Sequence, residues 1–143
     1  MDKILFSSNK DDWETPQDFF DKLNEEFNFN LDPCADRTNH KCEKFFTKDD
    51  NGLLQDWSGH TVFVNPPYGA KSTSDWIRKC AEESCKPHTT VVMLIPARTD
   101  TRAFHEYIYG KSEIRFIKGR LKFGGSKNSA PFPSMLVIFK KKG

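Results

Sequence analysis

Three stretches of the chain carry apolar residues at the spacing of an amphipathic helix. The first follows Thr15-Pro16, which combines a capping threonine with a proline at the first helical position. Its apolar positions are Phe19, Phe20, Leu23 and Phe27. The second helix is expected from Ser74 to about Cys85. The third is expected to begin at a cap on Asp100 and to end at Gly110.

Apolar runs between and after these helices predict strands. They lie at residues 29–31, 61–64, 89–95, 114–117 and 135–139. The run at 89–95 is the most hydrophobic, which suits the middle of a sheet that is covered on both faces. Strands that alternate with helices, followed by a strand pair at the end, predict an α/β sandwich with a parallel centre.

Length and composition narrow the class of protein. A chain of 143 residues has room for one domain with a real core but not for two. No apolar run approaches the roughly 18 residues that a membrane span needs, and the first residues show no signal-peptide pattern. A soluble cytoplasmic protein with a single domain over residues 1–143 is therefore expected.

The cysteines do not suggest a metal site. Cys34, Cys42, Cys80 and Cys85 lack the C-x2-C spacing of a zinc knuckle, although His40 lies close to two of them in sequence. Reduced and mostly buried thiols are expected, without a bound metal.

Charge is distributed unevenly along the chain. The net charge is only +2, but residues 111–143 hold nine lysines and arginines against a single acid, Glu113. This asymmetry favours a polyanionic partner that contacts one side of the protein. Four of the basic residues lie in a glycine-rich segment before the final strand, namely Lys118, Arg120, Lys122 and Lys127.

The motif Asn65-Pro66-Pro67-Tyr68 follows directly on the apolar run 61–64. Adjacent prolines hold the chain rigid and donate no N–H groups, so their carbonyls remain available as acceptors. The Asn65 side-chain oxygen and the Pro66 carbonyl could accept both hydrogens of a planar –NH2 group, and Tyr68 could stack on its face. The alternative is a proline-rich turn that only connects a strand to a helix.

Two residues upstream have both a structural and a functional interpretation. Trp13 could be a hydrophobic staple for the first helix or part of a ligand wall. Asp32 ends the strand at 29–31, a place where open α/β sheets bind ligands, but it could merely cap the next turn, the more common role of a lone Asp-Pro pair. No Gly-x-Gly-x-x-Gly follows it, so the phosphate-binding fingerprint of nucleotide domains is absent from the sequence.

Together these motifs resemble the amino-methyltransferases that use S-adenosylmethionine. Their order is Glu14-Thr15-Pro16, Leu31-Asp32-Pro33-Cys34-Ala35, Asp50-Asn51-Gly52-Leu53-Leu54 and Asn65-Pro66-Pro67-Tyr68. Three further stretches look like the phage-encoded DNA N6-adenine methyltransferase family: Trp13 with Thr15-Pro16, residues 94–101 and residues 130–135. The similarity spans roughly Asp12 to Phe139.

This resemblance implies a small Rossmann-like methyltransferase sandwich, with a mainly parallel central sheet and a C-terminal antiparallel strand. It implies transfer of a methyl group from S-adenosylmethionine to adenine N6 in DNA, with the base flipped out of the duplex. The catalytic residues would be Asn65, Pro66, Pro67 and Tyr68. The cofactor would be bound by Trp13, Thr15, Pro16, Asp32, Pro33, Cys34 and Asp50. DNA would be bound by Arg98, Lys118, Arg120, Lys122 and Lys127.

The sequence also departs from the family pattern. The first motif lacks the usual glycine, and the acid that would bind the cofactor ribose is unassigned among Glu43, Asp49 and Asp50. A separate target-recognition domain is missing, which predicts low sequence specificity. RNA and protein glutamine stay open as alternative substrates, because both present an –NH2 group on a planar carbon. A catalytically inactive DNA-binding module is the remaining alternative.

Overall fold

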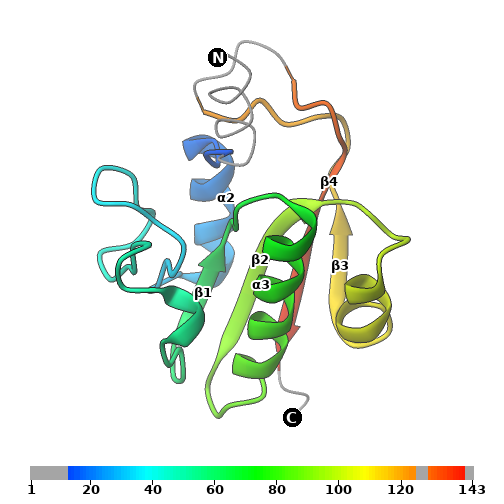
Figure 1. Cartoon of the computed structure of the whole chain (residues 1–143). Helices are drawn as coiled ribbons and strands as arrows, with labels where there is room; N and C mark the ends of the chain where they lie inside the picture. Colours follow the sequence, from blue (N-terminus) through cyan, green and yellow to red (C-terminus); the bar gives the residue numbers. More distant parts are fainter. Residues whose placement is uncertain (1–12, 125–128, 141–143) are drawn as a thin grey trace, which may run out of the picture.

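A computed structural model of the chain describes residues 13–124 and 129–140. At its centre lies a four-stranded sheet in the order β1-β2-β4-β3 (Figure 1). The strands are β1 (Thr61–Val64), β2 (Thr90–Pro96), β3 (Glu113–Phe116) and β4 (Ser134–Lys140). All four coincide with predicted strands to within a residue or two at each end.

Strand pairing in the sheet is mixed. β1 and β2 are parallel, whereas β4 is antiparallel to both of its neighbours, β2 and β3. The expected parallel centre is therefore confined to the β1–β2 pair. Residues 134–139 of β4 are all buried, so this strand needs cover and pairing on both sides. β3 has no fully buried residue, which suits the edge of the sheet.

The predicted strand at 29–31 is reduced to isolated bridges. Leu31 pairs in parallel with Val62, and Asp32 pairs in parallel with Phe45. The N–H of Phe63 donates to the carbonyl of Leu31 at 3.0 Å. These pairings extend the sheet beyond β1, so the residues after Leu31 leave it in the same direction as those after β1.

Helix α2 (Gln17–Phe27) covers one face of the sheet. Its buried Phe20 packs edge-on against Phe63 of β1, with 5.1 Å between ring centroids. The predicted cap is wrong, because the N-cap residue is Pro16, with no side-chain cap, and Thr15 lies outside the helix. The Thr15 hydroxyl instead accepts a hydrogen bond from Asn65.

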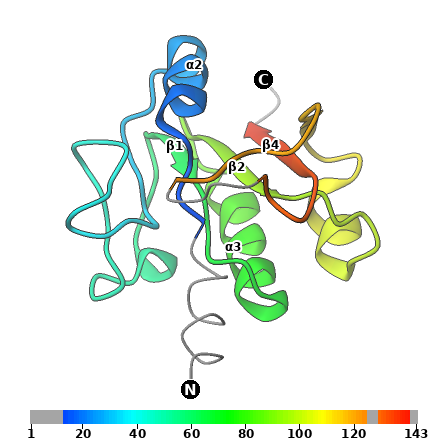
Figure 2. The same cartoon turned by 90° about the horizontal axis from the view of Figure 1, so that it is seen from above.

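Helix α3 (Ala70–Glu83) covers the opposite face, as the two views of Figures 1 and 2 show. It begins at Ala70 rather than Ser74 because its polar first turn is held by Thr73. The Thr73 hydroxyl accepts from the N–H of Gly69 and donates to the carbonyl of Pro67, each at 3.2 Å. Among the residues that the structure describes, no helix is long and apolar enough to span a membrane.

The third predicted helix is a single π-type turn, η2 (Phe104–Ile108). The N–H of Tyr109 donates to the carbonyl of Phe104, a five-residue spacing that widens the turn. The Thr101 hydroxyl, not Asp100, accepts from the first free N–H, that of Phe104, at 3.2 Å. A short 3-10 turn, η1 (Gly52–Leu54), lies before β1.

Candidate active site

The Asn65-Pro66-Pro67-Tyr68 motif lies at the edge of the sheet where β1 and β2 both end. This edge is the upper one in Figure 1, and the segment that joins β3 to β4 runs over it. Carboxyl ends of parallel strands are where open α/β sheets bind ligands. Two parts of the chain that are distant in sequence therefore meet at the motif, namely residues 13–16 and the described residues of the β3–β4 connection, 117–124 and 129–133.

The side-chain amide of Asn65 is held from one end. Its Nδ2 donates to the main-chain carbonyl of Trp13 and to the hydroxyl of Thr15, the latter at 2.9 Å. Its Oδ1 is buried and has no hydrogen-bond partner among the described residues. Because buried acceptors in native proteins are normally paired, this oxygen is fitted to receive a donor from a ligand.

Tyr68 is anchored rather than exposed. Its hydroxyl donates to the carbonyl of Leu94 in β2 at 3.0 Å, and only 7% of the residue is exposed. Burial raises the pKa of this hydroxyl above its ordinary value, and the nearby Cys34 raises it further. Tyr68 therefore stays protonated at any ordinary pH and does not act as a base.

Four rings form an aromatic cluster beside Asn65: Trp13, Tyr68, Phe123 and Phe132. Phe132 lies 5.3 Å from Trp13 and 5.6 Å from Tyr68 between ring centroids, both edge-on. Phe123 contacts the same two rings. The ring partners of Trp13 thus come from the β3–β4 connection. Tyr68, which is 7% exposed, packs within this cluster.

The carboxylate of Asp32 is used by its own loop. Its Oδ2 accepts from the N–H of Lys41 at 2.9 Å, and its Oδ1 accepts from the N–H of Cys34 at 3.3 Å. Burial raises the pKa of Asp32 above its ordinary value, and these two hydrogen bonds offset part of the increase. The carboxylate of Asp32 thus shapes its own turn, and its contact with a ligand stays a prediction.

Asp50 is exposed at the surface and lies in a turn that approaches the Asp32 loop. Its Oδ2 accepts from the N–H and the hydroxyl of Thr47, at 2.9 and 3.1 Å. The approach is closest at Gly52, where a Cβ atom would lie 2.1 Å from the carbonyl oxygen of Pro33. Only glycine fits there, so Gly52 brings two predicted cofactor segments together.

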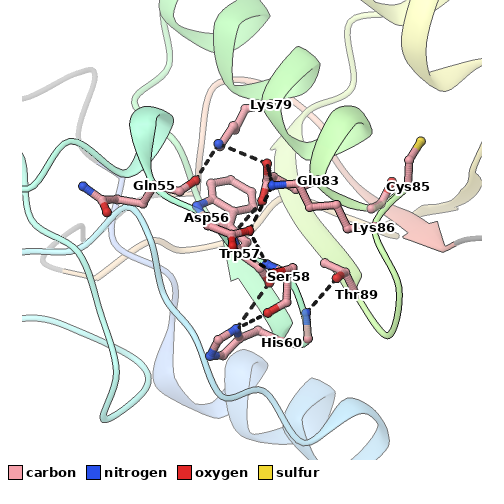
Figure 3. Close-up of polar contacts among 12 residues, drawn as sticks. Gln55, Asp56, Trp57, Ser58, His60, Lys79, Glu83, Cys85, Lys86 and Thr89 are labelled. Carbon is pink, nitrogen blue, oxygen red and sulfur yellow. Dashed lines mark hydrogen bonds and ion pairs between the residues drawn. The ribbon is translucent and has the colours of Figure 1, made fainter.

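A buried polar network anchors this turn to α3 (Figure 3). The indole N–H of Trp57 donates to the carbonyl of Gly52 at 3.0 Å, and the main-chain N–H of Trp57 donates to Glu83 at 2.6 Å. Lys79 and Lys86 donate to the other oxygen of Glu83, at 3.2 and 2.7 Å. Burial alone would raise the pKa of Glu83, but these hydrogen bonds together lower it.

Glu83 was not predicted to have a role, although its position carries a signal. Glu83 continues the helical spacing of Trp76 and Cys80 on the inward face of α3. An acidic side chain on the apolar face of a helix becomes buried, so it needs hydrogen-bond donors or positive charges beside it.

The predicted DNA-binding residues are exposed where the structure describes them. These are Arg98, Lys118, Arg120 and Lys122, whereas Lys127 lies outside the described residues. Arg120 and Lys122 line an open surface groove of about 320 Å³ together with Pro16, Phe19 and Lys22. The groove therefore places basic side chains next to the segment that contacts Asn65. Lys22 also lines this groove, and an exposed lysine on a helix carries no signal in the sequence that would single it out.

Comparison with known proteins identifies relatives of this chain. The sequence model of a family described as DNA N-6-adenine-methyltransferase (Dam) matches residues 3–142. A DNA N-6-adenine-methyltransferase of Haemophilus phage HP1 (strain HP1c1) is 33% identical over 143 aligned residues, which cover 94% of this chain and 82% of the relative. One from Escherichia phage T1 is 32% identical over 114 residues, which cover 78% of this chain and 47% of that relative.

Proposed function

Since this chain belongs to the DNA N-6-adenine-methyltransferase (Dam) family, we propose that it methylates the N6 amine of adenine in DNA with S-adenosylmethionine as the methyl donor. The chain is accordingly an adenine DNA methyltransferase. We further infer one small domain with a reduced Rossmann-like fold. The antiparallel β4 inserted beside parallel strands supports that inference.

The buried Oδ1 of Asn65 is the observation that carries the proposal. The lone pair of adenine N6 is delocalised into the ring, so the amine is a poor nucleophile. An acceptor at Asn65 Oδ1, with a second at the Pro66 carbonyl, holds both amine hydrogens and favours a pyramidal nitrogen with its lone pair available. This loop would contribute to catalysis by orienting the target amine in a site from which water is excluded.

The side chains around the loop at residues 65–68 are chemically suited to bind a methyl donor. S-adenosylmethionine, when bound, supplies an electrophilic methyl group. The exposed carboxylate of Asp50 suits the amine of the cofactor's adenine, and the turn at Asp32, Pro33 and Cys34 would form a wall beside it. Trp13 and Pro16 would lie near its methionine end.

DNA would be held by the basic surface. Arg98, Lys118, Arg120, Lys122 and Lys127 would contact phosphates, and Lys22 adds a further cation to the groove at Pro16. Phosphate contacts supply affinity but no sequence choice. A stacked adenine cannot reach Asn65, so the base would be flipped out and stacked against Tyr68. Because phosphate contacts carry no sequence information, sequence specificity would be low.

Labelled S-adenosylmethionine offered with DNA, RNA or protein extract tests the proposal directly. Nucleoside analysis should find the label in N6-methyladenine from DNA. Asn65→Ala should abolish turnover while calorimetry shows cofactor binding close to wild type. Label in RNA or in protein glutamine instead would reassign the substrate. Absence of cofactor binding would favour an inactive DNA-binding module.

A further inference from the structure

We propose that Thr15 is a positioning residue that, together with the main-chain carbonyl of Trp13, aims the Asn65 oxygen at the target amine. This inference rests on the proposed function, because it concerns the amide that would accept from adenine N6. It reassigns Thr15, whose place in the sequence motif had suggested a contact with the methyl donor.

A side-chain amide has two ends of nearly equal size and opposite hydrogen-bonding character. The environment of Asn65 distinguishes them, because the Trp13 carbonyl can only accept a hydrogen bond. With the amide reversed, Asn65 Oδ1 would face that carbonyl without a hydrogen between them, and Nδ2 would meet the hydrogens of the target amine. The Trp13 carbonyl therefore determines which end of the amide faces the substrate.

Thr15 fixes the plane of the same amide. Its hydroxyl lies 2.9 Å from Nδ2 and engages the second amide hydrogen, so both hydrogens have acceptors. A planar group held at two points cannot rotate without losing one of them. Thr15 is itself only 5% exposed, which keeps water from replacing its hydroxyl.

The segment that carries both acceptors is held independently of Asn65. The N–H of Gly124 donates to the carbonyl of Glu14 at 2.8 Å. The ring of Trp13 packs against Phe123 and Phe132 on the same β3–β4 connection. The segment with both acceptors therefore keeps its position without help from Asn65, so it can orient the Asn65 amide.

Thr15→Val and Thr15→Ser form the matched pair for the test. Valine keeps the shape of threonine and removes the acceptor, so kcat should fall about tenfold, the scale expected for one lost hydrogen bond. The KM for S-adenosylmethionine and for DNA should stay near wild type. Thr15→Ser keeps the hydroxyl and should recover most of the rate. Unchanged kcat in Thr15→Val, or a raised KM for S-adenosylmethionine at unchanged kcat, would overturn the proposal.

A second measurement does not depend on activity or on the stability of the variants. In the wild-type protein, NMR should show the Asn65 side-chain amide hydrogens protected from solvent exchange. Rapid exchange would show that the two acceptors do not hold the amide, and would overturn the inference. A wild-type protein with a protected Asn65 amide but no methylation of DNA would instead refute the proposed function.

Discussion

Replacing Glu83 with glutamine tests whether the buried network of Figure 3 holds the fold together. Glutamine has the shape of glutamate, and its one oxygen can still accept from the N–H of Trp57. Its –NH2 group would then face the ammonium groups of Lys79 and Lys86, which now donate to the carboxylate. Two charge-assisted hydrogen bonds are lost, and one buried lysine loses its counter-charge.

The size of the effect follows from burial. The side chains of Lys79 and Glu83 are 14% and 5% exposed, so their bond falls in the range of about 1.5–3 kcal/mol for hydrogen bonds to charged groups. Lys86 is 39% exposed and contributes less because solvent screens it. A total loss of roughly 3 kcal/mol corresponds to a decrease in Tm of about 10 °C for a domain of this size.

Thermal and urea unfolding of Glu83→Gln measure this loss, and Glu82→Gln is the control on the same helix. Glu82 pairs with Arg78 at 3.0 Å, but both side chains are more than half exposed, so its variant should unfold close to wild type. Equal stability of the two variants would show that the network does not stabilise the fold.

The same variant should change how stability depends on pH. The pKa of Glu83 is lower in the folded protein, so its carboxylate stabilises the fold above the unfolded pKa near 4.5. This stabilisation is lost as pH falls from there through the folded pKa. The free energy of unfolding, measured with urea from pH 7 to pH 3, should therefore decrease less for Glu83→Gln than for wild type. Identical pH profiles of the two proteins would contradict the assignment.

Two further changes test the neighbouring surfaces. Gly52→Ala places a Cβ atom against the Pro33 carbonyl and should weaken the binding of S-adenosylmethionine, measured by calorimetry. Unchanged affinity would show that the two turns can move apart without weakening cofactor binding. Arg120→Ala should weaken DNA binding to all sequences alike and lower the slope of log affinity against log salt by about 1. An unchanged slope would remove Arg120 from the phosphate contacts.

Local pattern predicted the strands and the place of the motif. Residues 61–64 and 90–96 are apolar runs with turn residues on both sides, so their burial could be read directly from composition. The Asn-Pro-Pro-Tyr loop was expected at the end of a strand and lies there. Helix ends were less accurate, because Thr15 and Ser74 were judged from local spacing. Asn65 engages Thr15 through a long-range contact, and Thr73 holds the first turn of α3 through local hydrogen bonds to Gly69 and Pro67.

Contacts between distant segments could not be predicted from the sequence. Nothing local to Asn65 indicates that its amide is held by residues 13 and 15, fifty positions upstream. Asp32 illustrates the same limit, because the sequence places an acid at a strand end but does not show that its carboxylate accepts from the N–H groups of Cys34 and Lys41.

The position of β4 has a consequence for synthesis of the protein. β4 lies between β2 and β3 but follows both in the chain, so those two strands share no ladder with each other. Until residues 134–140 leave the ribosome, β2 and β3 each present an unpaired edge, and such edges promote association between chains. Completion of the sheet is therefore a late, long-range step, and we expect nascent chains stalled before residue 134 to depend on chaperones.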